Sequence, residues 1–554
     1  MSKIIVYQIF TRLFGNRNTT RKENGAIAEN GCGKFADFDA KALKKIRELG
    51  ITHVWYTGVL RHATKTDYKK YGIPSQHKAM VKGNAGSPYA IADYYDVDPD
   101  LATNVKKRMT EFESLVARTH RAKLKMIIDF VPNHVARQYK SVCKPNGVKD
   151  FGENDNTDEG FNPQNNFYYC PGCSFEPYID KQAGERYTYT EIPAKATGND
   201  HFDNHPGIND WYETVKLNYG VDYWTRIGHF DPIPDTWLKM TDILLFWAGK
   251  GIDGVRCDMA EMVPAAFWAY ATAKVKEKYP DFIFIGEVYN PAEYRVYIHC
   301  GFDYLYDKVG MYDVMRAVTC HHCGAQAITG AWQANDDIRR HMLYFLENHD
   351  EQRIASDFFA GNGCKGVPAF VASSLMNTNP FMLYFGEEYG ERGMDKEGFS
   401  GYDGRTTIFD YWSVDTICRA SWGTLSDEER YLYNVHARVL NIANKEKAIV
   451  CGQFYDLMYA NPWTDKFNPE RQYAFLRKAD REMILVVVNF DDCDRYTEVR
   501  IPAHAFDLMK IIEKKATATD LLTDEKFEAT LIKDGTIGMN IAKRGARILK
   551  FAQV

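Results

Sequence analysis

Apolar runs of strand length alternate with amphipathic stretches of helix length along most of the chain. Residues 37–50 repeat apolar side chains at helical spacing, and Asp37 or Asp39 is expected to cap the start of that helix. The apolar runs between such helices lie at residues 4–10, 51–58, 125–134, 251–258, 282–287, 302–307, 342–350 and 380–388. Strands that are buried on both faces and joined by helices form parallel sheets. Eight such strand–helix units predict an α/β fold, a (β/α)8 TIM barrel.

The alternation is interrupted once and ends before the C-terminus. Residues 135–225 are rich in Asn, Asp, Gly and Pro, which predicts a loop-rich inserted domain B after the third strand. Residues 1–134 and 226–447 are expected to form the two parts of the barrel. Residues 448–554 hold short β segments without intervening helices, which predicts a C-terminal antiparallel β-sandwich.

Charged residues stand at the ends of three predicted strands. The run G-I-D-G-V-R-C-D ends on Arg256 and Asp258, a second run ends on Glu287, and a third ends on His349 and Asp350. Burying such charges is costly unless they are paired, which indicates a site. The carboxyl ends of barrel strands meet on one face, where barrel active sites lie. We therefore expect the three carboxylates to converge.

A group of carboxylates is suited to the hydrolysis of glycosidic bonds. One carboxyl protonates the leaving oxygen while another attacks the sugar or activates water. Asp258 lies two residues from Arg256 on the same face of a strand, and this cation favours the ionised form expected of a nucleophile. Glu287 ends an apolar strand, where desolvation is expected to raise its pKa and suit it to the acid role.

Four motifs resemble the signature regions of the alpha-amylase family, glycoside hydrolase family thirteen. They are D-F-V-P-N-H at 129–134, G-V-R-C-D at 254–258, G-E-V at 286–288 and N-H-D at 348–350. The motifs occur in the order and at the spacing of that family. The resemblance covers essentially the whole chain and implies a TIM barrel, an inserted domain after the third strand and a C-terminal β-sandwich.

The resemblance also implies a role for each matching residue. Asp258 would be the nucleophile of a covalent glycosyl-enzyme, Glu287 the general acid and then base, and Asp350 a ligand of the sugar hydroxyls. Asp129 would support the site. The implied substrate-binding residues are Arg256, His134, His349 and Tyr89. For the two histidines and the tyrosine, the alternative is that they pack as ordinary core residues.

Departures from the family pattern bear on calcium. Many alpha-amylases hold calcium between the barrel and the inserted domain. Here Asn133 is kept, but Lys216 stands where that site has an acid, and Met262 stands where it has a histidine. Calcium prefers several oxygen ligands. We therefore expect this calcium site to be absent and predict no cofactor and no metal at the active site.

Other departures weaken the assignment of a narrower activity. Glu261 and Met262 replace residues typical of endo-acting amylases, and Ala90 replaces an aspartate typical of exo-acting alpha-glucosidases. What remains is action on α-linked glucans or maltooligosaccharides, with hydrolysis favoured over transfer. A non-catalytic carbohydrate-binding protein is the alternative from another class, disfavoured because all three acids are present.

Composition limits the possible partners. The net charge of −5 over 554 residues and the absence of a polybasic run argue against nucleic acid. No apolar run is long enough to cross a membrane, and the N-terminal run is too short for a signal peptide, so a cytoplasmic location is expected unless a leader was removed. Two pairs, Cys170 with Cys173 and Cys320 with Cys323, have zinc-like spacing, although reduced loop thiols are the alternative.

Overall fold

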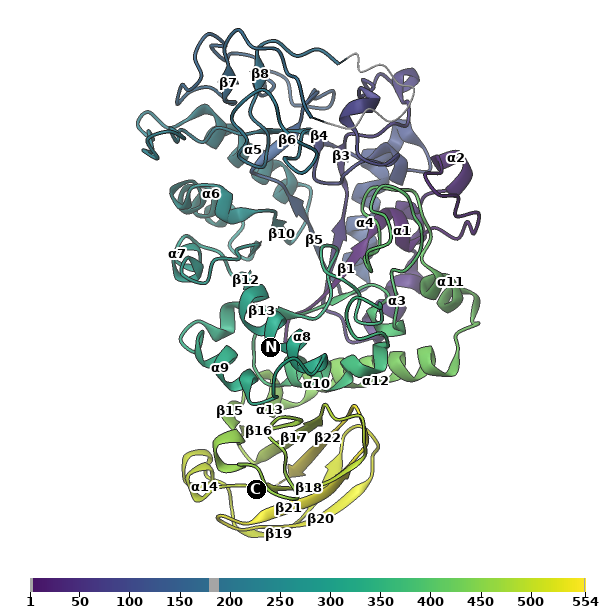
Figure 1. Cartoon of the computed structure of the whole chain (residues 1–554), viewed down its shortest axis with the longest axis vertical. Coiled ribbons are helices and arrows are strands. Elements are labelled where there is room, and N and C mark those ends of the chain that lie inside the picture. Colours follow the sequence, from purple (N-terminus) through teal and green to yellow (C-terminus); the bar gives the residue numbers. More distant parts are fainter. Residues whose placement is uncertain (1–2, 179–188, 553) are drawn as a thin grey trace.

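Eight parallel strands form a closed barrel at the centre of the molecule (Figure 1). The computed structural model describes residues 3–178, 189–552 and 554. The strand order around the barrel is β1-β14-β13-β12-β11-β10-β5-β2. These strands are β1 (Ile5–Phe10), β2 (His53–Thr57), β5 (Lys125–Phe130), β10 (Gly254–Cys257), β11 (Ile283–Gly286), β12 (Tyr304–Tyr306), β13 (Met342–Phe345) and β14 (Phe381–Tyr384). Each falls within a predicted strand, so the prediction of a TIM barrel is confirmed.

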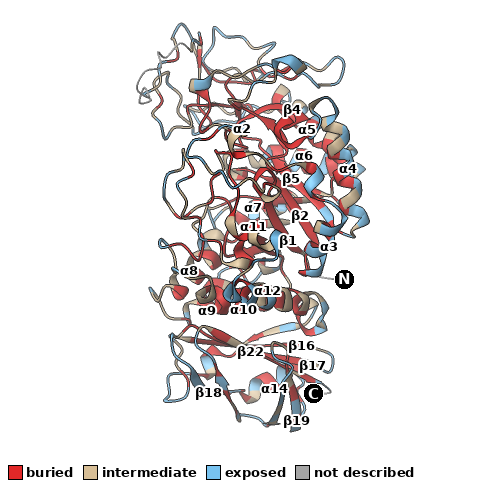
Figure 2. Cartoon of the chain, turned by 90° about the vertical axis from the view of Figure 1, so that its right-hand side faces the viewer, coloured by how far each residue is buried: buried red, intermediate tan, exposed pale blue. Residues whose placement is uncertain are grey.

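Most helices around the barrel have one face buried and the other in solvent, whereas the strands are almost entirely buried (Figure 2). Asp39 caps the first long helix, since its side chain accepts a hydrogen bond of 2.8 Å from the Ala42 N–H. The helices of the barrel are α1 (Thr11–Phe14), α2 (Ile27–Asn30), α3 (Ala40–Glu48), α4 (Arg108–Arg121), α5 (Asp235–Gly249), α6 (Ala265–Lys278), α7 (Tyr294–His299), α8 (Asp313–Thr319), α9 (Ala327–Gln333), α10 (Val367–Leu375), α11 (Asp415–Trp422) and α12 (Asp427–Lys445).

The barrel interior is filled by side chains that alternate along the strands. Trp55, Ile127, Ile285 and Leu343 belong to one buried cluster inside the barrel. Residues between them along the strands pack outward against the helices, as the two-residue period of a strand requires. The interior is therefore a packed core, and functional side chains can gather only at its ends.

The long connection after β5 contains two small antiparallel ribbons and extended loops. One ribbon pairs β6 (His134–Ala136) with β9 (Thr214–Lys216), and the other pairs β7 (Tyr169–Cys170) with β8 (Ala194–Lys195). A further ribbon, β3 (Leu60–His62) with β4 (Ile91–Val97), follows β2. Figure 1 shows these segments at the end of the barrel opposite the C-terminal domain.

The C-terminal region is an antiparallel β domain, as predicted. A six-stranded sheet in the order β15-β16-β17-β22-β19-β20 packs with the ribbon β18-β21. Its elements are α13 (Lys447–Val450), β15 (Gln453–Asp456), β16 (Gln472–Ala479), β17 (Glu482–Asn489), β18 (Arg495–Arg500), α14 (Ala503–Met509), β19 (Lys514–Asp520), β20 (Lys526–Leu531), β21 (Thr536–Ile541) and β22 (Gly545–Ala552). In the described part of the chain, no helix is both long enough and apolar enough to span a membrane.

Candidate active site

A buried guanidinium joins two of the predicted catalytic carboxylates. Arg256 lies on β10 and is fully buried. Its Nη1 donates a hydrogen bond of 2.6 Å to Asp258 Oδ1, and its Nη2 forms an ion pair of 2.8 Å with Glu287 Oε1. Because Arg256 and Asp258 are two residues apart, they face the same side of the barrel wall. The structure thus brings together the acids that end β10 and β11.

Glu287 has two further partners close to the site. Its Oε2 accepts a hydrogen bond of 2.7 Å from the Met259 N–H, and its Oε1 accepts one of 2.7 Å from the Tyr289 hydroxyl. Met259 has a φ of 43°, a left-handed conformation that is costly for a residue with a side chain. This strain directs a backbone donor at the carboxyl group that ends β11.

The residues that end β13 form the other side of the cluster. His349 Nε2 lies 3.1 Å from Asp350 Oδ2 and 2.5 Å from the Tyr89 hydroxyl. The rings of Tyr89 and His349 stack with their centroids 5.1 Å apart, and Arg256 lies 5.6 Å from the Tyr89 ring centroid. His349 Nδ1 also lies 2.8 Å from Gln8 Nε2 on β1. Tyr89, His349 and Asp350 therefore adjoin the Arg256 cluster.

Burial and the proximity of other carboxylates raise the pKa of several acids in the site. Burial, and then the neighbouring Glu287 and Asp350 charges, raise the pKa of Asp258 well above its usual value, although Arg256 acts in the opposite direction. Burial and the Glu287 charge likewise raise the pKa of Asp350 to about 7, even though 41% of its side chain remains exposed within the site. Burial raises the pKa of Asp129 to about 6. These three aspartates therefore hold protons more readily than isolated aspartates do.

Both predicted histidines are held as neutral rings. Burial, followed by the Arg256 charge, lowers the pKa of His349 well below its usual value. Burial and the nearby Lys216 ammonium lower the pKa of His134 to about 3. His134 begins β6 and reaches the site through a hydrogen bond with the Tyr89 backbone. Neutral imidazoles can donate hydrogen bonds to a sugar without adding charge.

A lysine ammonium lies among the oxygens that the family resemblance associates with calcium. Lys216 Nζ donates to Asn133 Oδ1, forms an ion pair of 2.7 Å with Asp200 Oδ1 and lies 3.3 Å from the Met262 carbonyl oxygen. Lys216 is buried, and burial lowers the pKa of its ammonium. An ammonium on these oxygens repels a second cation, so the residues present do not fit a calcium ion.

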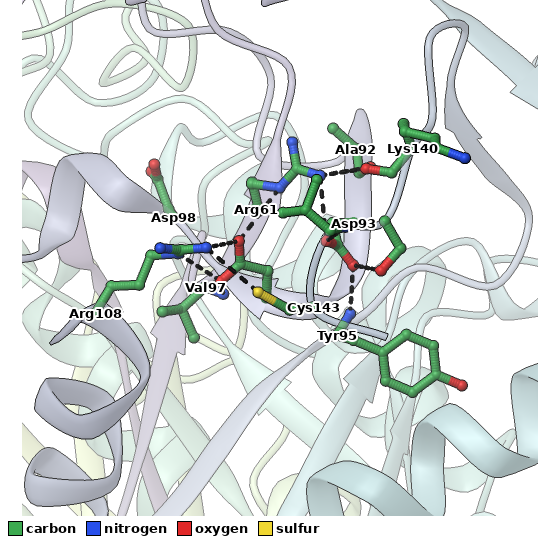
Figure 3. Close-up of polar contacts among 12 residues, drawn as sticks. Arg61, Ala92, Asp93, Tyr95, Val97, Asp98, Arg108, Lys140 and Cys143 are labelled. Carbon is green, nitrogen blue, oxygen red and sulfur yellow. Dashed lines mark hydrogen bonds and ion pairs between the residues drawn. The ribbon is translucent and has the colours of Figure 1, made fainter. Parts of the chain in front are cut away.

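One other group of potential metal ligands is neutralised by arginines. Within the described ranges, Asp93, Asp96 and Cys143 are the group whose ligand atoms lie close enough to share an ion. Arg108 holds Asp96 through bonds of 2.7 and 2.8 Å, and Arg61 lies 3.2 Å from Asp93 (Figure 3). Two guanidiniums already balance the two carboxylates. This cluster therefore ties β3 and β4 to the following loops, and it offers no open cation site.

Some site residues escaped the sequence analysis. Gln8 is a polar residue within an apolar strand. Tyr289 lies two residues after Glu287, so the side chains of Tyr289 and Glu287 lie on the same face if the extended chain continues. Arg405, which donates a hydrogen bond of 2.6 Å to the Asp350 carbonyl oxygen, comes from the loop after β14. Polar residues within apolar strands and the two-residue period were available signals for the first two.

Comparison with known proteins agrees with this architecture. The family model "Alpha amylase, catalytic domain" matches residues 8–430. Alpha-amylase 3 of Dictyoglomus thermophilum is 24% identical over 429 residues, which are 73% of this chain and 74% of that protein. Neopullulanase 2 of Thermoactinomyces vulgaris is 23% identical over 511 residues, which are 88% of this chain and 69% of that protein.

A solved structure extends the likeness to the entire fold. CldA, described as a cyclomaltodextrin glucanotransferase with a three-domain ABC distribution, superposes with a TM-score of 0.66 at 15% identity, and the match covers 100% of both chains. At this identity the likeness concerns the fold alone. The match to the family model spans most of the chain and shows the family to which the chain belongs. The chain belongs to the alpha-amylase catalytic-domain family and is a glycoside hydrolase of the alpha-amylase type.

Proposed function

We propose that this enzyme is a retaining glycosidase that acts on α-linked glucans or maltooligosaccharides by double displacement. The observation that carries the proposal is the pair of contacts from Arg256, 2.6 Å to Asp258 and 2.8 Å to Glu287. Retaining glycosidases need two carboxyl groups close together, one as nucleophile and one as acid. A shared guanidinium keeps these two close without leaving either as an unpaired buried charge.

The first step forms a glycosyl-enzyme. The Asp258 carboxylate attacks the anomeric carbon while Glu287 gives its proton to the glycosidic oxygen, so the bond to the leaving sugar breaks and that sugar departs as an alcohol. Asp350, His349 and His134 are proposed to hold the hydroxyl groups of the glucose unit being attacked. Tyr89 is proposed to stack on the same unit, since its ring already packs beside His349.

The second step distinguishes hydrolysis from transfer. Glu287 takes a proton from water as the water attacks the anomeric carbon, and Asp258 leaves as a carboxylate. A sugar hydroxyl in place of water gives a new glycoside by the same chemistry. Hydrolysis is the first candidate. Transfer is the second, because the matching proteins include a cyclomaltodextrin glucanotransferase as well as amylases.

Incubation with maltoheptaose tests this function. Shorter maltooligosaccharides released as α-anomers, observed by proton NMR before mutarotation, are expected from a retaining hydrolase. Products longer than the substrate identify transfer instead. β-Anomers contradict the retaining mechanism. Binding of maltoheptaose with no products of either kind favours a carbohydrate-binding protein without catalysis.

A further inference from the structure

A chain of hydrogen bonds leads from Glu261 to the carboxyl group of Glu287. Glu261 lies in a short 3-10 turn, η6 (Ala260–Met262), that follows β10. Its Oε2 accepts hydrogen bonds of 3.0 Å from the backbone N–H groups of both Tyr289 and Asn290. The Tyr289 hydroxyl then donates its bond of 2.7 Å to Glu287. One carboxylate thus holds the stretch of chain that carries the hydroxyl.

The backbone around Glu261 is held as firmly as its side chain. The Tyr297 hydroxyl, from α7, donates to the carbonyl oxygens of Glu261 at 3.2 Å and Val263 at 3.1 Å. The Ala260 N–H donates to the Glu287 carbonyl oxygen at 3.0 Å. The loops after β10 and β11 therefore form one unit, in which Glu261 sets the position of residue 289 relative to the reacting carboxyl.

The partners of Glu287 differ in what they can do when its charge changes. The Arg256 guanidinium and the Met259 N–H can only donate hydrogen bonds, so they serve a carboxylate and not the proton of a carboxylic acid. A tyrosine hydroxyl can donate or accept. Among these three partners, Tyr289 is the one able to receive a hydrogen bond from protonated Glu287.

We propose that Glu261 and Tyr289 are positioning residues for the acid–base step, an inference that rests on the proposed function of Glu287. Glu261 fixes the 289–290 backbone, and the Tyr289 hydroxyl turns from donor to acceptor as Glu287 gains its proton. The hydroxyl thereby holds the Glu287 carboxyl group in one position in both protonation states, and from that position the acid gives its proton to the leaving oxygen. Glu261, which replaces a residue typical of endo-acting amylases, acts here on the enzyme's own acid.

Rates on two substrates that differ in their need for an acid distinguish a positioning role of Tyr289 from a general role in packing. Cleavage of maltotetraose requires protonation of the leaving oxygen, whereas α-maltosyl fluoride releases fluoride with little help from an acid. Tyr289→Phe is expected to lower kcat/KM for maltotetraose about tenfold or more, the effect of losing one hydrogen bond to a charged group, and to change the fluoride rate by less than about threefold. Glu287→Gln should show the same selectivity more strongly.

Matched variants complete the test. Tyr294→Phe removes a buried hydroxyl that has no hydrogen-bond partner among the described residues, and it should leave both rates unchanged. Glu261→Ala is expected to reproduce the Tyr289→Phe pattern, and Glu261→Gln, which keeps an acceptor oxygen, should restore the rate. Equal losses on both substrates, or no loss for Tyr289→Phe, overturn the positioning role. A wild-type enzyme that cleaves neither substrate overturns the proposed function itself.

Discussion

Asp258 combines a proposed reactive role with a costly position. Only 6% of the residue is exposed, and the Glu287 and Asp350 carboxyls lie close enough to oppose its charge. Arg256 is the cation that offsets this repulsion. Such competition keeps protons in the site at pH values where an isolated aspartate has lost its own.

The pH dependence of activity follows from this environment. A nucleophile must be ionised, and burial raises the pKa of Asp258, so kcat/KM should fall as the pH decreases through that raised value. The groups that face Asp258 are Arg256, Glu287 and Asp350. The acidic limb of a kcat/KM profile with maltoheptaose is therefore expected above the ordinary aspartate value of about 3.9. A limb at or below that value contradicts the raised pKa.

Replacement of the proposed nucleophile gives the most direct prediction. Asp258→Asn keeps the shape of the side chain but cannot form the glycosyl ester, so kcat with maltoheptaose should fall by about a thousandfold or more. Circular dichroism should show an intact fold. Asp242→Asn, at an exposed position on α5, is the matched control and should keep full activity. Comparable turnover by the Asp258 variant excludes it as the nucleophile.

At the scale of elements, the loop-rich connection is anchored to the barrel by a side-chain cation. Lys216 ends β9, and its ammonium reaches oxygens from the β5–β6 connection, from the loop at Asp200 and from η6. The strand register places Lys216 opposite His134, a predicted substrate ligand. The same residue therefore links the inserted segment and the turn after Asp258 through its ammonium, and His134 through strand pairing.

This arrangement predicts stability without calcium. The melting temperature of the wild-type enzyme should be the same with EDTA and with added calcium. Lys216→Met should lower it by several degrees, because the Asp200 carboxylate loses its cation. Lys216→Asp replaces the ammonium with a carboxylate, and calcium is expected to raise the melting temperature of that variant alone. If EDTA lowers the melting temperature of the wild-type enzyme and calcium restores it, the proposal that the Lys216 ammonium takes the place of calcium is contradicted.

At the scale of the molecule, one buried arginine joins the C-terminal β domain to the barrel. Arg477, on β16, donates to the carbonyl oxygens of Met376, Ala448, Ile449 and Gly452. Met376 follows α10, while Ala448 and Ile449 belong to α13, so a single guanidinium satisfies helix ends from both domains. Figure 1 shows α10, α13 and β16 where the barrel meets the C-terminal domain.

Substitution of Arg477 at this junction should lower stability without changing activity. Arg477→Met leaves several buried carbonyl oxygens without donors, which is expected to lower the free energy of unfolding by about 3 kcal/mol. Calorimetry measures the shift, and kcat below the transition should stay unchanged. Arg500→Met, which removes a half-exposed ion pair with Asp534, is the control and should cost about 1 kcal/mol or less. Equal effects of the two substitutions contradict the proposed junction.

The sequence by itself determined the barrel and the rim on which the candidate site lies. Eight apolar runs separated by helices admit few other folds, and charged residues at strand ends must meet at one rim because parallel strands point the same way. The two-residue period already placed Arg256 and Asp258 on one face. These conclusions need only local pattern and chain direction.

Only the tertiary structure decided which groups share hydrogen bonds and protons. Tyr289 meets Glu287, and Lys216 meets Asp200, because loops of irregular conformation bring them together. The raised pKa of Asp258 likewise depends on distances to acids from other strands. Electrostatic interactions and hydrogen bonds vary steeply with distance and burial, and neither can be read from the order of residues along the chain.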